Sequence, residues 1–190
     1  MKDITKNELS FVLVVFKTPE KRYNANSISK ILGITPMGAL KIARKLEKEE
    51  IIKGNEEERK RYYEIAKNDY AKDFVRFALK QEREQSEVRG WVLDIKKLEG
   101  AKIAIMFGSI LTNQRTAMDI DVLLITEQKD FKKLEDSIEK KNRISSKKIH
   151  PVFQTIQDLK SNIKKTDRVV LNALKGIVVL GEDYLVEELV

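Results

Sequence analysis

The chain has 190 residues, of which 42% are hydrophobic, and its net charge is +7 with a pI of about 9.4. It contains no cysteine, which excludes disulfide bonds and thiolate metal sites. The longest apolar run, residues 11–16, is far too short to cross a membrane, and the first residues lack a secretory signal pattern. We therefore expect a cytoplasmic protein without a membrane segment, whose basic charge favours polyanionic partners.

Residues 1–49 show three helical segments. The first, residues 5–17, has an apolar stripe made of Leu9, Val12, Leu13 and Phe16. The second, residues 27–32, ends at Gly33, which suits the left-handed conformation of a tight turn between helices. Thr35 and Pro36 then supply an N-cap and a first-turn proline for a third helix that runs to about residue 49.

The third helix has two different sides, and a charged hairpin follows it. Its apolar side consists of Leu40, Ala43 and Leu46. Its other side presents Lys41, Arg44, Lys45 and Lys48, the spacing of a helix that lies in a DNA major groove. Residues 51–53 and 60–65 read as two strands joined by a polar turn, residues 54–59. Basic side chains gather near the tip of this hairpin: Lys53, Arg59, Lys60 and Arg61.

This order of elements over residues 1–66 resembles the winged-helix DNA-binding domains of small prokaryotic regulators. The resemblance implies double-stranded DNA as a partner, with the third helix in the major groove and the hairpin, or wing, against phosphates or the minor groove. The residues that would contact DNA are Thr35, Lys41, Arg44, Lys45 and Lys48 in the helix and Arg59 and Arg61 in the wing. A solvated surface or a protein-interaction module is the alternative, because acidic residues dilute the positive field: Glu47, Glu49, Glu50, Glu56, Glu57 and Glu58.

Residues 67–100 are rich in charges and helix formers and predict a helical connector. Apolar residues recur there at helical spacing: Phe74, Phe77, Ala78, Val88, Trp91, Val92, Ile95 and Leu98. Gly90 is a candidate break. One interpretation packs the first part on the winged helix and the second on the domain that follows. The other makes residues 68–99 a homodimer contact, which suits the two-fold symmetry of most operator sites.

The C-terminal part carries the pattern with the clearest chemistry. Residues 101–107 and 122–125 are apolar runs that predict buried strands. Phe107-Gly108-Ser109 follows the first run, and Asp119-Ile120-Asp121-Val122 opens the second. Carboxylates at i and i+2 of a strand point to the same face, and a glycine lets backbone amides approach an anion closely. Carboxylate oxygens suit Mg²⁺ or Mn²⁺, which complete their shell with water and substrate phosphates.

The spacing resembles the signature of the polymerase-beta nucleotidyltransferase superfamily, over residues 101–190. The resemblance implies a mixed sheet with flanking helices, closed by a strand at residues 176–181. It also implies that Gly108 and Ser109 bind a nucleoside triphosphate, and that Asp119 and Asp121 hold Mg²⁺ (or Mn²⁺) as catalytic ligands. The reaction would transfer a nucleoside monophosphate to a hydroxyl acceptor.

The sequence also departs from that signature. Active members carry a third carboxylate on a later strand, whereas the expected strand, residues 147–155, has none, and we expect Gln154 in its place. His150, the only histidine, reads as a structural or surface residue, or as a replacement base if it faces Asp119. Asp-x-Asp at a solvated strand edge and Gly-Ser in an ordinary turn are the alternative to a metal site.

Taken together, the patterns predict an α+β protein with three parts. Residues 1–66 form a winged helix of three helices plus a β-hairpin, residues 67–100 a helical connector, and residues 101–190 a nucleotidyltransferase-like mixed sheet. The predicted function is DNA binding combined with binding of a nucleoside triphosphate and Mg²⁺, with or without nucleotidyl transfer. The alternative is a catalytically inactive regulator, or an antitoxin-like interaction protein, that has kept the nucleotidyltransferase fold.

Overall fold

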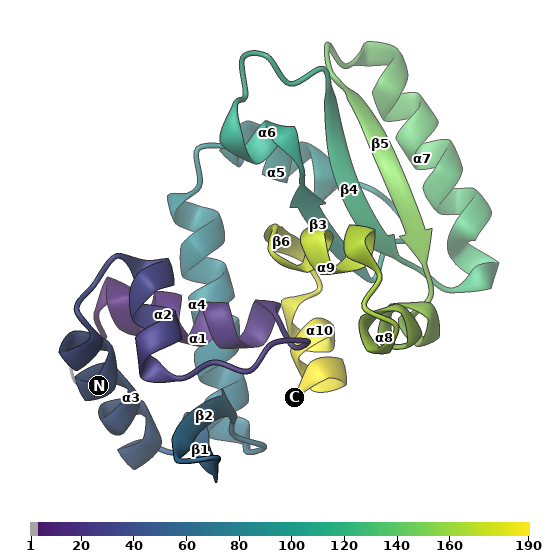
Figure 1. Ribbon diagram of the computed structural model, residues 1–190. Coiled ribbons are helices and arrows are strands. Elements are labelled where there is room, and N and C mark those ends of the chain that lie inside the picture. The colour runs from purple at the N-terminus through teal and green to yellow at the C-terminus, as the bar shows by residue number, and fades with distance from the viewer. Residues whose placement is uncertain (1–3) are drawn as a thin grey trace. The chain divides into compact units, whose positions relative to one another are not determined.

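The computed structural model describes residues 4–190, which divide into two compact units (Figure 1). The first unit extends to Leu79 and includes Leu189 and Val190, and the second unit is Lys80–Glu188. Helices and strands occur in both units, so the predicted α+β class is confirmed. The predicted connector is divided between the units, because helix α4 (Asp69–Gln85) crosses their boundary.

The first unit contains three helices followed by a hairpin, which is the winged-helix arrangement. The helices are α1 (Lys6–Lys17), α2 (Ala25–Leu32) and α3 (Pro36–Lys48), and the hairpin strands are β1 (Ile52–Glu57) and β2 (Lys60–Ile65). Strands β1 and β2 pair antiparallel. A single β-bridge between Tyr23 and Tyr63 ties the segment between α1 and α2 to this hairpin.

Capping residues set the helix boundaries of the first unit. The Thr5 hydroxyl and the Glu8 carboxylate form a capping box at the start of α1, and Asn24 with Ser27 forms another at α2. Gly33 ends α2 with a φ of 64°, as the sequence predicts. The predicted N-cap of α3 is confirmed too, because the Thr35 hydroxyl oxygen accepts the Gly38 N–H at 3.1 Å.

The core of this unit lies between the three helices and the hairpin. Its fully buried side chains include Phe11, Val12, Ile28, Ala39, Ala43, Leu46 and Ile51. Phe11 meets Tyr63 edge to face, with ring centroids 5.7 Å apart. The apolar stripe predicted for α1 is partly wrong, because Leu9 and Leu13 are only half-buried. Phe11 and Val15 take the central positions instead.

The hairpin turn differs from the prediction. Residues 54–57 belong to strand β1, so the loop contains only Glu58 and Arg59, with φ values of 50° and 62°. Two central residues with positive φ are the geometry of a type I′ turn, whose backbone twist matches that of the two strands. Because neither residue is a glycine or an asparagine, the sequence gives no sign of this turn.

We expect replacement of Glu58 and Arg59 by Asn-Gly to stabilise the hairpin by about 1 kcal/mol, because both native residues occupy a region that side chains disfavour. Hydrogen exchange of the β1 and β2 amides in the full chain measures the change. The matched control is Glu58→Asn alone, which should give less than half of the effect. An unchanged or faster exchange in the Asn-Gly variant would contradict the assigned turn.

The second unit is built on a four-stranded sheet. Its strands are β3 (Ile103–Phe107), β4 (Asp119–Ile125), β5 (Lys148–Gln154) and β6 (Ile177–Leu180), in the order β5-β4-β3-β6. Strands β4 and β5 are parallel, and the other two pairings are antiparallel. The predicted strands therefore exist, including the closing strand before Gly181, and the mixed sheet is confirmed.

Helices cover both faces of this sheet (Figure 1). The helices are α5 (Arg89–Ile95), α6 (Ser109–Thr112), α7 (Phe131–Ile144), α8 (Ile156–Lys164) and α9 (Arg168–Leu174), and a short 3-10 turn, Gln128–Asp130, precedes α7. Helix α10 (Glu182–Leu189) follows strand β6. Met106, Val122 and Leu124 pack in one apolar cluster with residues of α5, α6 and α7. Helices α8 and α9 contact strands of the sheet as well.

The segment before the sheet differs in one respect from the prediction. Helix α4 ends at Gln85 and α5 begins at Arg89, so residues 86–88 interrupt the helical segment. Gly90, the predicted break, lies inside the first turn of α5.

Within residues 4–190, no helix has the length and apolar character needed to cross a membrane.

Candidate nucleic-acid interface and candidate metal site

Helix α3 exposes a row of basic side chains on the side opposite to its buried residues. Lys41, Arg44 and Lys48 are all exposed, and at positions i, i+3 and i+7 they lie along one side of the helix. Ala39, Ala43 and Leu46 are buried on the other side. Within residues 4–190 the three basic side chains form no ion pair, so their charge faces solvent. We call these three residues the cationic row.

Thr35 lies at the N-terminal end of the same surface and is exposed. Its hydroxyl oxygen accepts the Gly38 N–H, and its own hydroxyl proton is left to donate. The residue can therefore cap the helix and contact a phosphate oxygen at the same time.

Lys45, one of the predicted DNA contacts, has a partner inside the protein. Its Nζ lies 2.7 Å from Oε1 of Glu8, a residue of α1 that is only 5% exposed. Burial raises the pKa of Glu8, but the hydrogen bonds from Lys45 and from the Thr5 backbone N–H outweigh it and lower the pKa overall. The Lys45 charge thus compensates a buried carboxylate.

Arg61, another predicted contact, forms ion pairs with two glutamates. Its Nη2 lies 2.6 Å from Oε1 of Glu47 on α3, and its Nη1 lies 3.2 Å from Oε1 of Glu56. These carboxylates raise the pKa of Arg61 above its ordinary value, with Glu47 the main cause. The absence of a side chain at Gly54 permits this arrangement, because a Cβ there would lie 2.3 Å from Oε1 of Glu47.

The wing is less acidic than its sequence indicates. Of its three consecutive glutamates, Glu56 pairs with Arg61 and Glu57 pairs with Arg22. Arg59, the remaining predicted contact, is exposed in the two-residue turn. Arg22 and Glu57 lie 35 positions apart in the chain, so no local pattern indicates their pairing.

We expect Arg61→Ala to weaken DNA binding on the order of fivefold, because it uncovers the Glu47 carboxylate beside the cationic row. Fluorescence anisotropy with a labelled duplex measures the change. The double variant Arg61→Ala, Glu47→Ala should regain most of the lost affinity. If the double variant stays as weak as the single one, Arg61 contacts a phosphate directly and its masking role is wrong.

The second unit brings Asp121 and Gly108 into direct contact. Strands β3 and β4 pair Phe107 with Asp121, and Gly108 follows with a φ of 79°. A Cβ at Gly108 would lie 2.2 Å from Oδ2 of Asp121, so only glycine fits there. Asp119, two residues earlier on β4, is exposed and points to the same face of the sheet. Ser109 is exposed in the first turn of α6.

The strand register places His150 beside Asp121. These residues pair across β4 and β5, and His150 Nδ1 lies 3.1 Å from Oδ1 of Asp121. Gln154, the residue we expected in place of the third carboxylate, pairs instead with Ile125. Four residues of strand separate it from His150, about 13 Å, so that expectation is wrong.

The donors around Asp121 fit one ion and lack a third ligand. Asp119 and Asp121 are oxygen donors of the kind that Mg²⁺ and Mn²⁺ prefer, and these ions need only one or two protein carboxylates. Within residues 4–190, however, no three Asp, Glu, His or Cys side chains group closely enough to hold a metal ion. An ion here would depend on water or on a bound phosphate for most of its shell.

A cleft of about 490 Å³ lies at the opposite end of β4, away from the aspartates, and its lining includes Lys102, Glu127, Lys129 and Tyr184. Lys102 and Lys129 each bind one oxygen of Glu127 and lower its pKa to about 2. Asp119 and Asp121 do not line this cleft. No motif of the sequence marks these residues as a group.

Comparison with known proteins gives no family assignment. No family model matches the chain, and no curated protein matches it. Among solved structures, the adhesin competence repressor AdcR from Streptococcus pyogenes is 18% identical with a TM-score of 0.39, over 50% of this chain and 69% of that one. A mutant of ZitR from Lactococcus lactis is 18% identical with a TM-score of 0.38, over 50% of this chain and 61% of its own. Likenesses of this size assign no function.

Proposed function

We propose that this protein is a DNA-binding transcription regulator that contacts double-stranded DNA through α3 and the wing. The cationic row is the observation that carries the proposal. Lys41, Arg44 and Lys48 project from one side of a helix whose other side is fixed in the core. Neutralisation of phosphates by such side chains supplies most of the affinity of DNA-binding proteins, and a helix of this kind fits the major groove.

Two further features support this reading. Glu47 lies on α3 and Glu8 on α1, and each carboxylate pairs with a basic residue, Arg61 and Lys45 respectively. Their negative charge therefore does not oppose phosphates next to the cationic row. At the end of the wing, Arg59 remains exposed for a phosphate or the minor groove.

The test is duplex binding by the full chain at several salt concentrations. Arg44→Ala and Lys48→Ala should each lower the affinity and reduce the slope of log K against log salt by about one. Lys164→Ala, an exposed lysine of α8, is the matched control and should change neither quantity. If both α3 variants bind DNA as the wild type does, the proposed interface is wrong.

We include in this proposal a homodimer formed through residues 68–99. Tyr70 and Phe77 are 53% and 39% exposed on α4, and their i, i+7 spacing places them on one side of the helix. A second copy that covers this side would also match a two-fold DNA site. Light scattering should give twice the chain mass for the wild type and the monomer mass for Phe77→Glu. A monomeric wild type would end this part of the proposal.

A second candidate function is binding of a nucleoside triphosphate with one Mg²⁺ or Mn²⁺ at Gly108, Ser109, Asp119 and Asp121. The contact between Gly108 and Asp121 favours it, because it joins the bend that would receive phosphates to a metal ligand. Transfer of a nucleoside monophosphate to a hydroxyl is a further step, and the missing third ligand weighs against it. The regulator reading needs no such step.

Electron paramagnetic resonance of Mn²⁺ tests this second function. Binding of Mn²⁺ should strengthen when ATP is added, and Asp121→Asn should abolish the gain. Asp130→Asn, an acidic residue outside this site, is the control. If ATP changes Mn²⁺ binding equally in all three proteins, the site does not bind a metal-nucleotide complex.

A further inference from the structure

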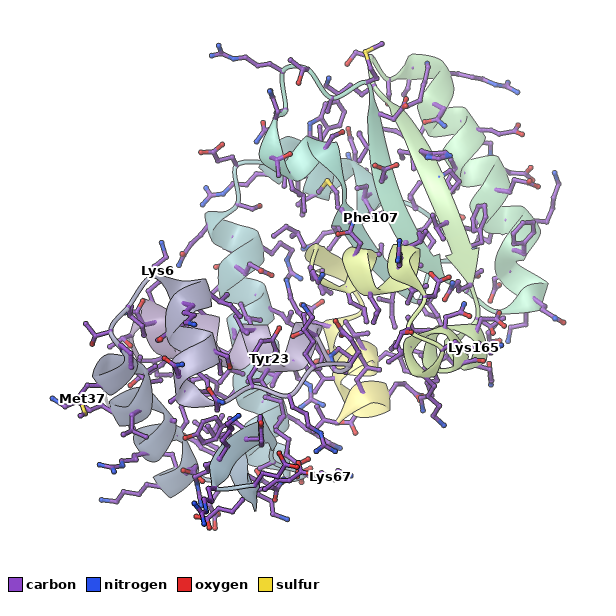
Figure 2. All side chains as sticks on the ribbon, in the orientation of Figure 1. Lys6, Tyr23, Met37, Lys67, Phe107 and Lys165 are labelled. Carbon is purple, nitrogen blue, oxygen red and sulfur yellow. The ribbon has the colours of Figure 1, made fainter. Side chains whose placement is uncertain are left out.

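Met37 is an exposed apolar side chain at the start of α3. It is the second residue of the helix and is 60% exposed, and Figure 2 shows it projecting outward from the first unit. A single exposed apolar side chain is common on protein surfaces, so a role for Met37 depends on its neighbours on the helix. The buried residues of α3 are Ala39, Ala43 and Leu46, and the predicted Leu40 is only half-buried, so Met37 does not belong to the core.

Helical geometry places Met37 in line with the cationic row. Residues 37, 41, 44 and 48 are spaced i, i+4, i+7 and i+11, and at 3.6 residues per turn they fall within an arc of about 60°. Met37 is therefore the N-terminal end of the surface that also carries Lys41, Arg44 and Lys48. Leu40, which is half-buried, and Lys45 lie next to this arc on either side, and Lys45 is engaged by Glu8.

The chemistry of the surface indicates what Met37 meets. Three basic side chains in a row favour a polyanion, and in helix-turn-helix proteins the N-terminal residues of the recognition helix contact base edges. The main apolar group that a base edge presents in the major groove is the C5-methyl group of thymine. A methionine side chain is flexible and polarisable, so it adapts well to such a methyl group.

We propose that Met37 is a specificity-determining residue that contacts a thymine methyl group in the major groove, while the cationic row contacts phosphates. This inference rests on the proposed DNA binding and adds the base that the helix selects. Thr35, two residues earlier in the chain, is placed to fix the helix end on a phosphate.

The test removes the methyl group from the DNA and the thioether from the protein. Binding sites are selected from a random duplex pool with the full chain, and the same sites are then made with deoxyuridine in place of thymidine. The wild type should bind the deoxyuridine duplex about fourfold more weakly, the effect of one buried methyl-sized group. Met37→Ala should bind the thymidine duplex with a similar loss and show no further loss on deoxyuridine.

Ile31→Ala is the matched control, because Ile31 is 52% exposed on α2 and lies outside the row. It should retain both the affinity and the thymine preference. Equal wild-type affinity for the two duplexes, selected sites without thymine, or a thymine preference that survives in Met37→Ala would each overturn the inference. If the wild type selects no duplex at all, the proposed DNA binding itself fails, and that outcome is distinct from the others.

Discussion

Replacement of Arg83 by methionine is expected to lower the free energy of unfolding of the second unit by about 3 kcal/mol. The Arg83 side chain is 8% exposed, and its guanidinium donates to Oε1 of Glu182 at 2.9 Å and to the carbonyl of Val178 at 3.1 Å. Removal of the arginine leaves a largely buried carboxylate and a carbonyl of strand β6 without their donor. An uncompensated buried charge is the costly part of this change.

The pH dependence of stability follows from Glu182. Burial raises the pKa of Glu182, but the hydrogen bond from Arg83 and the N–H of Glu182 itself outweigh it and lower the pKa overall. A lowered pKa means that the pair contributes its full stability above the ordinary value of 4.5 and loses it as the pH falls through the folded value. Arg83→Met should lack this acid-dependent loss.

Hydrogen exchange of the β3 and β6 amides at pH 7 measures the effect in the full chain. The double variant Arg83→Met, Glu182→Met replaces both charges by apolar groups and should recover most of the loss. A change below 1 kcal/mol in Arg83→Met, or a double variant that is no better than the single one, would show that the pair is not required.

Replacement of Lys45 by alanine is expected to destabilise the winged helix by about 2 kcal/mol. This loss is smaller than the loss expected for a fully buried ion pair, because the lysine side chain is one-third exposed and water screens its charge. Glu8 would keep its Thr5 hydrogen bonds but lose its counter-ion inside the core. Since the pKa of Glu8 is lowered, the wild-type contribution is complete at neutral pH and disappears as the pH falls below 4.5. Hydrogen exchange of the α1 amides reports this loss.

A second substitution separates the structural role of Lys45 from DNA contact. Lys45→Ala with Glu8→Gln removes the uncompensated charge and should restore much of the stability. If Lys45 is structural, this double variant also retains the wild-type salt dependence of DNA binding. If the slope of log K against log salt concentration is smaller by about one in the double variant, Lys45 contacts a DNA phosphate instead.

Local signals explain what the sequence predicted well. Gly33 and the Thr35-Pro36 pair act on the backbone within a few residues, and they set the helix-turn-helix correctly. Apolar runs identified strands β3 and β4, and the resemblance to the nucleotidyltransferase superfamily supplied β5 and β6. The spacing of Gly108 and Asp121 indicated a contact that the structure contains.

Long-range pairing explains what the sequence missed. The partner of Lys45 lies in α1, and the partner of Arg61 lies in α3, so no local pattern distinguishes these residues from exposed bases. The choice of His150 over Gln154 depends on the register of two parallel strands joined by a long crossover, which composition does not fix. The wing turn was missed because Glu58 and Arg59 are rare residues in its geometry.

The position of the sole histidine has a practical consequence. Because the chain holds one imidazole, its carbon-bound protons give a single pair of sharp signals in a one-dimensional NMR spectrum, with no assignment required. That ring is 70% exposed and touches Asp121, so anything that enters the neighbourhood of the two aspartates should displace these signals. Unlabelled protein and a series of small anions or metal salts would be enough for a first survey of what this part of the molecule recognises.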